Sequence, residues 1–505
     1  MMKALFVASA ALALLALPPG AEAGKADDTL NVAFSAEVEP LDNYKIAGRE
    51  GLILTRHVFD GLLYKDMDSG TFKPALATAW KFTSPTAIEL DLRQGVTFHN
   101  GEAFDADDVV YTLTTIADPK YGTRYKIVID WIKNVEKLDK FKVRINMSKA
   151  YAPALEMLAD NLPIYPNEYF AQAGSQGMAA KPVGTGPYRL VEFTPGTRYV
   201  LERFDGHYAG SPKGKPAIKR IVVRTIPEAN TQYAELLTGK LDWIWRVPPD
   251  QAKRLAANPA VQIVSGGIMR IGYVHFNVAE KAKKFPTGNV KVRQAIMHAV
   301  NRQAIIDAFV GGASKVVHPA CNPAQFGCAT DVKQYAYDPA AAKKLLAEAG
   351  FPNGLDIELM FAAMPRPQAE AIAADLGKVG IRVTLNEQQY AAAAPKWRAG
   401  EVPMVLGNWG SYGIGDVAMI LGNFFAGGAD DLVGDAEIKA WIDTGDTATD
   451  PAVRKDAYAK ALKKIADNAM WMSLWDFNVN FGVSKDLAFK PYPDEFARFY
   501  RAAWK

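Results

Sequence analysis

Residues 87–110 read Ala87-Ile-Glu-Leu-Asp-Leu-Arg-Gln-Gly-Val-Thr-Phe-His-Asn-Gly-Glu-Ala-Phe-Asp-Ala-Asp-Asp-Val-Val110, and this stretch contains a strand, a turn and the start of a helix. In its first six residues, isoleucine and leucine alternate with glutamate and aspartate. Because successive side chains of a strand point to opposite faces, this alternation predicts a strand over residues 87–92 with one buried face. Gly95 ends the strand.

Three aspartates near the end of the stretch, Asp105, Asp107 and Asp108, precede apolar residues at helical spacing. Carboxylates at the start of a helix accept hydrogen bonds from its free amides and interact favourably with its dipole. The cluster therefore predicts the first turn of a helix and needs no catalytic role.

The rest of the chain alternates strand and helix patterns. Residues 219–226 predict a strand, residues 229–238 a helix, and residues 241–245 a second extended segment, which together form a crossover unit. Further helices are expected over residues 290–309, 339–349, 369–378 and 451–468, and further strands over residues 29–34, 354–361, 381–385, 471–475 and 477–483. These patterns support a multi-domain α/β or mixed α+β chain.

The charge of the chain argues against a nucleic-acid partner. Its 505 residues include 58 Lys plus Arg and 55 Asp plus Glu, a formal net charge of +3, without any long block of like charges. Proteins that bind DNA or RNA carry a basic patch or stripe. No nucleic-acid partner is therefore expected.

The sequence also lacks the common signatures of catalysis and metal binding. It has no H-E-x-x-H zinc helix and no G-x-S-x-G elbow, and its six histidines are scattered. Gly184-Thr-Gly-Pro-Tyr188 lacks the third glycine of a dinucleotide loop, because Arg189 occupies that place, and predicts a tight turn that enters a strand. We expect no catalytic residue, metal site or cofactor.

The first 23 residues have the pattern of a secretory signal peptide. Lys3 supplies a positive charge, residues 4–17 are apolar apart from Ser9, and Ala21-Glu-Ala23 places small residues at the cleavage site. As a helix, residues 4–17 span about 21 Å, less than the roughly 30 Å of a hydrocarbon layer. We expect residues 1–23 to be removed and the mature chain to lie outside the cytoplasm.

Cys321 and Cys328 are the two cysteines of the sequence. This count excludes a disulfide scaffold and a four-cysteine zinc site. Disulfides persist outside the cytoplasm, and Pro323 and Gly327 permit a tight reversal between the two cysteines, so a disulfide is expected. Two unpaired buried thiols are the alternative.

Three groups of segments carry a family signature. The first is the stretch quoted above together with Lys73-Pro-Ala-Leu-Ala-Thr-Ala-Trp80 before it. The second covers residues 183–188, 201–208, 226–231 and 236–242, and the third covers residues 292–302, 337–339, 344–350 and 372–381. Together they resemble the peptide/nickel family of extracytoplasmic solute-binding proteins of ABC importers, also described as the oligopeptide- and dipeptide-binding family.

The resemblance implies a fold class and a domain organisation. The implied fold is α/β (mixed α+β), a two-lobed periplasmic-binding-protein clamp with an additional small domain inserted in the first lobe. Domain I is expected to be discontinuous, over residues 24–67, 181–270 and 479–505. Residues 68–180 are expected to form the inserted domain II, and residues 271–478 domain III, the second lobe. The ligand is enclosed between the lobes.

The resemblance also implies a function. The chain is expected to be the periplasmic substrate-binding component of an ABC importer, which captures a short peptide or peptide-like solute and delivers it to permease subunits in the inner membrane. A monomer is expected because the lobes of a clamp must move. Two alternatives remain open: capture of a metal chelate, as nickel-binding relatives do, and a secreted hydrolase of small amides, since catalytic triads form in space.

Trp409 is the first candidate for a ligand contact, because it lies where a β-rich run gives way to a glycine-rich loop. In peptide-binding relatives the corresponding loop resembles W-x-x-D, and the aspartate binds the ammonium group of the ligand. An ungapped count places Tyr412 at that position, and a one-residue gap places Ser411 there. Either Asp416 supplies the carboxylate from a shifted position, or the ligand has no free amino terminus there.

Two further segments resemble ligand-binding parts of the family. Arg366 corresponds to the place from which dipeptide-binding relatives offer an arginine to the ligand carboxylate, and a solvated surface arginine is the alternative. Residues 45–50 resemble the segment whose main chain binds an extended peptide, which marks Ala47 and Arg49 as candidates.

Overall fold

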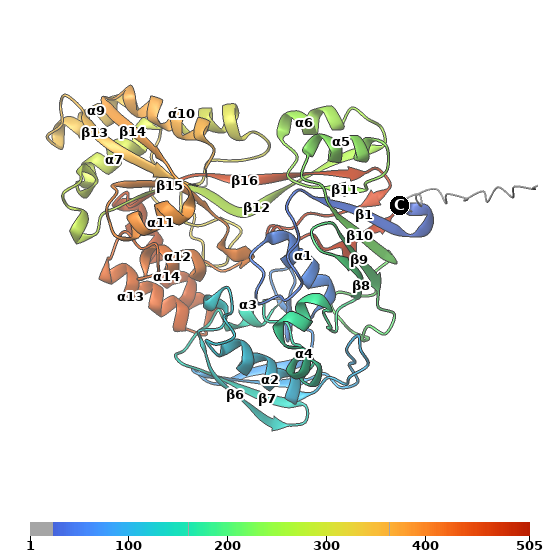
Figure 1. Cartoon of the computed structure of the whole chain (residues 1–505). Coiled ribbons are helices and arrows are strands. Elements are labelled where there is room, and N and C mark those ends of the chain that lie inside the picture. The colour runs from blue at the N-terminus through green and yellow to red at the C-terminus, as the bar shows by residue number, and fades with distance from the viewer. Residues whose placement is uncertain (1–23, 160, 363) are drawn as a thin grey trace, which may run out of the picture.

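The computed structural model describes residues 24–159, 161–362 and 364–505, so the predicted signal peptide over residues 1–23 lies outside the described residues. In the part of the chain that is described, no helix has the length and hydrophobicity needed to cross a membrane. The main elements of this part are a ten-stranded mixed sheet, a four-stranded antiparallel sheet and fourteen α-helices (Figure 1). The predicted α/β, mixed α+β class is confirmed.

The ten-stranded sheet passes through the whole molecule and joins its two lobes (Figure 1). Its order is β14 (Ile381–Glu387), β13 (Leu355–Phe361), β15 (Met404–Trp409), β12 (Val261–Phe276), β16 (Trp471–Ser484), β11 (Trp243–Ile244), β1 (Thr29–Phe34), β10 (Arg220–Thr225), β9 (Arg198–Arg203) and β8 (Tyr188–Thr194). The strands from β11 to β8 belong to the first lobe, and β13 to β15 belong to the second lobe (Figure 1).

Two long antiparallel strands, β12 and β16, link the lobes. The C-terminal part of β12 pairs with β15 of the second lobe, and the C-terminal part of β16 pairs with β11 of the first lobe. Their mutual pairing shifts twice, between Ile268 and Ile271 and between Ile271 and Tyr273. Such irregularities bend a strand locally, so the bend lies between the two lobes.

The first lobe carries α1 (Arg49–Val58), α5 (Ala229–Leu237) and α6 (Pro249–Leu255) around its half of the sheet. The turn predicted at residues 184–188 leads directly into β8. A Cβ atom built on Gly184 would lie 2.2 Å from the carbonyl oxygen of Val58, so only glycine lets this turn pack against the end of α1.

A small sheet forms the inserted part of the first lobe. Its order is β4 (Ala77–Ser84), β5 (Ala87–Leu92), β7 (Lys142–Met147) and β6 (Ile132–Asp139), and α2 (Ala106–Ala117) and α4 (Asn167–Ala180) lie beside it (Figure 1). The strand predicted at residues 87–92 is β5, with Ile88, Leu90 and Leu92 buried. The prediction is confirmed.

The aspartate cluster caps α2 as predicted. The Asp105 carboxylate accepts a hydrogen bond from the Asp107 amide at 2.8 Å, and the Asp108 carboxylate accepts one from the Asp105 amide at 2.8 Å. This reciprocal pair satisfies amides that have no partner within the helix.

The described part of the second lobe contains the helices from α7 to α14. These helices are α7 (Val290–Ala299), α8 (Arg302–Ile305), α9 (Pro339–Glu348), α10 (Arg366–Gly377), α11 (Tyr390–Arg398), α12 (Ala418–Phe425), α13 (Ala436–Thr447) and α14 (Pro451–Asp467). The helices α13 and α14 face the inserted domain (Figure 1), where the Ala152 amide donates to the Asp446 carbonyl at 2.7 Å. Short elements complete the chain: β2 (Leu63–Lys65), β3 (Phe72–Pro74), α3 (Ala154–Leu158), β17 (Leu487–Ala488) and β18 (Ala503–Trp504).

One predicted helix is wrong in its extent. The helix expected over residues 290–309 ends at Ala299, because Val300 is extended and the Asn301 side chain caps a new helix, α8, followed by a π-helical turn over Ile306–Val310. The β-rich return expected over residues 471–475 and 477–483 is one strand, β16, which pairs with β12.

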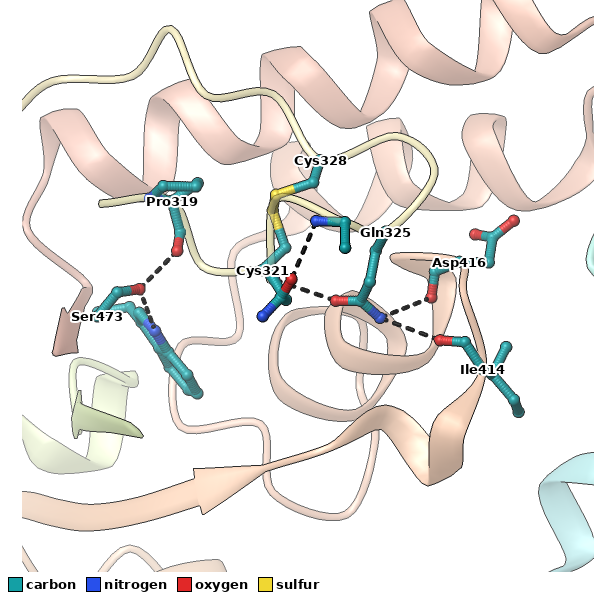
Figure 2. Close-up of a disulfide and its surroundings, with 10 residues drawn as sticks. Pro319, Cys321, Gln325, Cys328, Ile414, Asp416 and Ser473 are labelled. Atoms are coloured by element: carbon teal, nitrogen blue, oxygen red, sulfur yellow. Dashed lines mark hydrogen bonds between the residues drawn. A yellow bond between two sulfur atoms is a disulfide. The ribbon is translucent and has the colours of Figure 1, made fainter. Parts of the chain in front are cut away.

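The predicted disulfide is present and braces the loop that follows β15 (Figure 2). Cys321 and Cys328 are bonded, with their Cα atoms 5.8 Å apart. Inside the loop that they close, the Gln325 side-chain amide donates to the carbonyls of Ile414 at 3.2 Å and Asp416 at 3.4 Å. The disulfide loop therefore holds the segment that contains three of the seven predicted ligand contacts, Ser411, Tyr412 and Asp416.

Candidate functional site

A cavity of about 310 Å³ lies where the two lobes, the inserted domain and the linking strands meet. Ligand pockets usually measure roughly 300–1,000 Å³, so this volume suits a small guest. The lining residues come from six parts of the chain: Asn43, Tyr44, Ala47, Arg49, Leu52, Arg56; Thr123, Tyr125, Val128, Asn161; Arg246; Arg270; Asn408, Trp409, Gly410, Ser411, Tyr412; and Phe496.

Five of the seven ligand contacts predicted from sequence line this cavity: Trp409, Ser411, Tyr412, Ala47 and Arg49. Trp409 is the last residue of β15, as its place between a β-rich run and a glycine-rich loop indicates. Its ring centroid lies 5.0 Å from that of Tyr412 and 5.3 Å from that of Phe424, both edge to face. The packing fixes the indole ring in the wall of the cavity.

Unsatisfied polar groups accompany these aromatic contacts. The indole N–H of Trp409 and the hydroxyl of Ser411 are buried and have no hydrogen-bond partner among the described residues. Buried polar groups in proteins are nearly always paired, and the exceptions call for an explanation. A polar guest in the cavity would supply such partners.

Backbone strain concentrates around the cavity. Six non-glycine residues of the described chain have positive φ, and four of them are here: Arg246, Ser411, Tyr412 and Glu495. The first three line the cavity, and Glu495 binds two of its arginines. Strained backbone costs free energy and clusters at functional sites.

Aromatic rings close one side of the cavity. Tyr125 of the inserted domain faces Tyr412 of the second lobe, with ring centroids 5.1 Å apart. The Tyr125 hydroxyl also donates to the Ala47 carbonyl at 3.1 Å. Tyr125 thus contacts both the segment that precedes α1 and the loop that follows β15 in the second lobe.

Four arginines, Arg49, Arg56, Arg246 and Arg270, contribute the charge of the lining. Arg270 lies on β12, and its guanidinium donates to Asn408 Oδ1 at 2.6 Å and to Glu495 Oε1 at 3.1 Å. Arg49 and Arg56 lie on α1.

A shared aromatic platform orients the two α1 arginines. The ring of Phe496 faces the guanidinium of Arg49 at 4.5 Å and that of Arg56 at 3.7 Å. Planar cations on an aromatic face are held with their donors directed sideways.

The other two predicted contacts, Asp416 and Arg366, lie outside the cavity lining. Asp416 is buried, and its carboxylate accepts a hydrogen bond from Arg454 at 2.8 Å and another from the Ala418 amide at 3.0 Å. Arg366 is half exposed and pairs with Glu370 and Glu387 at 2.9 and 2.8 Å. These two side chains do not reach the cavity, because Asp416 pairs with Arg454 in the interior of the second lobe and Arg366 pairs with two glutamates at its surface.

Sequence reasoning did not find Arg56, Arg246, Arg270, Asn408 and Tyr125. Arg270 offered one signal, since it is the single charged residue in the β-rich segment Val264–Phe276 apart from a histidine. Arg246 follows Trp245, whose ring it covers at 4.0 Å, but its positive φ has no counterpart in the sequence.

The lining is suited to hydrogen bonding and ion pairing. It contains arginine, asparagine, tyrosine, serine and threonine, and among the described residues that line it none is an aspartate, glutamate, histidine, cysteine or lysine. General acid–base catalysis usually relies on residues of the second group. Within the described residues, no cluster of three or more metal-ligating side chains occurs.

Comparisons with known proteins agree with this geometry. A sequence model described as "Bacterial extracellular solute-binding proteins, family 5 Middle" matches residues 71–431. Heme-binding protein A of Haemophilus influenzae is 30% identical to the chain, over 70% of the chain and 69% of its own length. The dipeptide-binding protein of Escherichia coli is 30% identical, over 66% of the chain and 67% of its own length. The solved structure of HbpA2 from Haemophilus parasuis is similar with a TM-score of 0.84 and 25% identity, over 94% of this chain and 100% of that one.

Proposed function

Because this chain belongs to the bacterial extracellular solute-binding proteins of family 5, we propose that it is the receptor of an ABC importer, which captures a short peptide or peptide-like solute and delivers it to the permease. The observation that carries the proposal is the cavity whose wall is built from both lobes and from the linking strand β12.

Closure around the solute is the mechanism. A ligand shifts a conformational equilibrium only through its different affinity for the two states, and a change from 1:99 to 99:1 requires about 5.5 kcal/mol. In the open form, a solute would contact only part of the lining. In the closed form it also contacts Trp409, Ser411 and Tyr412 from the second lobe, and these added contacts provide the difference.

The proposal includes a location and an oligomeric state. Residues 1–23 act as a cleaved signal peptide that sends the chain to the periplasm, where the bond between Cys321 and Cys328 is stable. The mature chain works as a monomer, with permease subunits of the inner membrane as its partner. It releases the solute chemically unchanged, as a binding component of an importer does.

We also propose the domain boundaries given above. Residues 24–67, 181–270 and 479–505 form domain I, residues 68–180 the inserted domain, and residues 271–478 the second lobe. The ten-stranded sheet supports this division, because β16 begins beside β12 at the second lobe and reaches β11 in the first.

Mass spectrometry and X-ray scattering test the proposal together. Native protein purified from its own host should retain a small solute. After the solute has been removed, adding it back should decrease the radius of gyration of the protein. The solute should be recovered with its mass unchanged. An unaltered radius of gyration at saturation, or steady conversion of the solute, would contradict the receptor proposal.

Trp409→Ala should weaken binding of the co-purifying solute by about 1–3 kcal/mol, because the variant removes buried aromatic surface from the cavity wall. Titration calorimetry gives the affinity, and a thermal melt shows whether the variant is folded. Trp441→Ala is the matched control, since Trp441 is a half-buried tryptophan of α13 outside the lining. Equal loss of affinity in both variants would place Trp409 in the scaffold.

A further inference from the structure

A second cavity, the side compartment, has a volume of about 60 Å³ and adjoins the first, since Asn408 and Trp409 line both. Its described lining comes from β12, β15, α11, α12 and the segments that follow β13 and α12, all in the second lobe. The shape of the side compartment is therefore set within one lobe, before the two lobes close.

Aromatic rings form much of the wall of the side compartment, and packing holds them in place. Tyr273 stacks on Trp471, with ring centroids 4.0 Å apart, and meets Phe424 edge to face at 5.4 Å. Tyr390 packs edge to face against Trp397 at 5.5 Å. Rings that are already fixed need not be ordered by an entering group, so little entropy is lost when one binds.

Gly407 of β15 leaves one side of the compartment without a side chain. Its partner in the register of β12 is Tyr273. A Cβ atom built on Gly407 would lie 2.7 Å from the Tyr273 hydroxyl oxygen, so a larger residue would have to displace the tyrosine ring. Aromatic side chains cover glycines of a neighbouring strand in this way. Glycine at position 407 thus keeps the tyrosine wall in its place.

The acid and the histidine of the described wall, Asp430 and His275, do not make the compartment a site for a charged group. The Asp430 carboxylate already accepts hydrogen bonds from Trp397 at 2.9 Å and Arg398 at 2.8 Å. Burial lowers the pKa of His275 to about 3, so its imidazole is neutral at pH 7. The remaining wall is mainly apolar, and such a wall favours an apolar group over a charged one.

The volume limits the size of the group that fits. A cavity of roughly 150 Å³ holds benzene, and one water molecule occupies about 30 Å³ of the liquid. The 60 Å³ of the side compartment therefore hold about two methyl-sized groups and exclude an aromatic ring. A valine side chain ends in two methyl groups.

From its size, its walls and its position, we propose that the side compartment takes one side chain of the captured peptide, a short branched aliphatic chain of about the size of valine. This inference rests on the proposed receptor function and specifies the substrate class of the same site. Trp409, which lines both cavities, then contacts the peptide on both sides of its indole ring. An apolar side chain that displaces water from an apolar wall raises the affinity.

Five dipeptides test the inference: Ala-Ala, Val-Ala, Ala-Val, Phe-Ala and Ala-Phe. Calorimetry with the mature protein, stripped of its co-purifying solute, should show one of the two valine peptides binding at least about 10-fold more tightly than Ala-Ala, since two more methyl groups are buried. Phenylalanine at the same position should bind no more tightly than alanine, because its ring is too large for the compartment.

Enlarging the compartment should change this preference. Leu432 lines it and is 2% exposed. Leu432→Ala makes room for a ring, so this variant should bind the phenylalanine peptide at least about 10-fold more tightly than the natural protein does. Leu376→Ala is the matched control, since Leu376 is a fully buried leucine of α10 outside both cavities, and it should keep the preference for valine.

Thermal melts show whether both variants are folded, and the five peptides with the natural protein decide the matter if one is not. The inference is wrong if neither valine peptide gains tenfold over Ala-Ala, which would mean that the compartment holds water only. It is also wrong if phenylalanine at the favoured position binds as tightly as valine, or if none of the five peptides binds. Each of these results leaves the receptor proposal intact as long as the co-purifying solute still closes the protein in the scattering experiment. Loss of that closure would refute the receptor function itself.

Discussion

Lys213→Met is expected to lower the free energy of unfolding by about 3–5 kcal/mol, because it leaves a buried carboxylate without its counter-ion. The Lys213 ammonium lies 2.8 Å from the Asp60 carboxylate, and both side chains are 2% exposed. The same ammonium donates to the carbonyls of Arg56 at 2.8 Å and Phe59 at 2.7 Å, which end α1. Urea unfolding at pH 7.5 measures the loss.

The loss should depend on pH. Burial raises the pKa of Asp60, but Lys213 and His207, whose Nε2 lies 3.8 Å from the carboxylate, outweigh it and bring the pKa well below its ordinary value. A carboxyl group whose pKa is lower in the folded state stabilises the fold above its unfolded pKa of about 4 and loses that contribution as the pH falls. The difference between the two proteins should therefore be largest near neutral pH and smaller on acidification.

A matched surface pair provides the control. Lys490 pairs with Asp68 at 2.6 Å, and both side chains are more than half exposed, so Lys490→Met should leave the unfolding curve almost unchanged. If Lys213→Met unfolds like this control at pH 7.5, the pair of Lys213 and Asp60 contributes no stability.

Arg454→Met is expected to have a comparable effect, about 3–5 kcal/mol, in the second lobe. The Arg454 side chain is 10% exposed and donates to Asp416, which is 2% exposed, at 2.8 Å. It also donates to the Gly445 carbonyl at 2.8 Å and to the Tyr458 hydroxyl at 3.0 Å. The variant leaves the Asp416 carboxylate buried in the lobe without its counter-ion.

This variant also tests the role of Asp416, which sequence resemblance connects with ligand binding. The double variant Arg454→Met with Asp416→Asn removes both charges and should recover part of the lost stability. Asp416→Asn alone should bind the co-purifying solute within about 2-fold of the natural protein, because Asp416 is outside the cavity lining. A loss of affinity of tenfold or more would show that Asp416 takes part in ligand binding.

Elements with a strong local pattern were predictable from the sequence. Apolar and charged residues alternate regularly over the strand at residues 87–92, and carboxylates that cap the following helix mark its start. Both elements were therefore placed correctly. The strand β12 was missed for a physical reason: Gly266 and Gly267 interrupt its pattern. Gly266 is needed there, because a Cβ atom would lie 2.7 Å from the Pro491 side chain, and β16 supplies the pairing that local propensity does not.

The cavity was predictable only in part. Trp409 and its loop were found because a strand end followed by glycines is visible in one short segment. The guanidinium groups of Arg56, Arg246 and Arg270 converge only after three distant segments pack together, and no local pattern records that convergence. Asp416 was predicted as a ligand-binding carboxylate because the sequence does not show that Arg454, from a later helix, pairs with it.

The strand β16 and the residues after it complete the first lobe, and this has a consequence for the order of synthesis. Trp243 of β11 packs against Phe481, Phe489 and Phe499, and the Phe499 amide donates to His57 of α1 at 2.9 Å. A nascent chain still attached to the ribosome lacks these residues until its final stage, so β11 keeps an open edge throughout elongation. Long-range pairing of this kind forms slowly. The first lobe therefore cannot complete its fold until residues 471–499 have been synthesised.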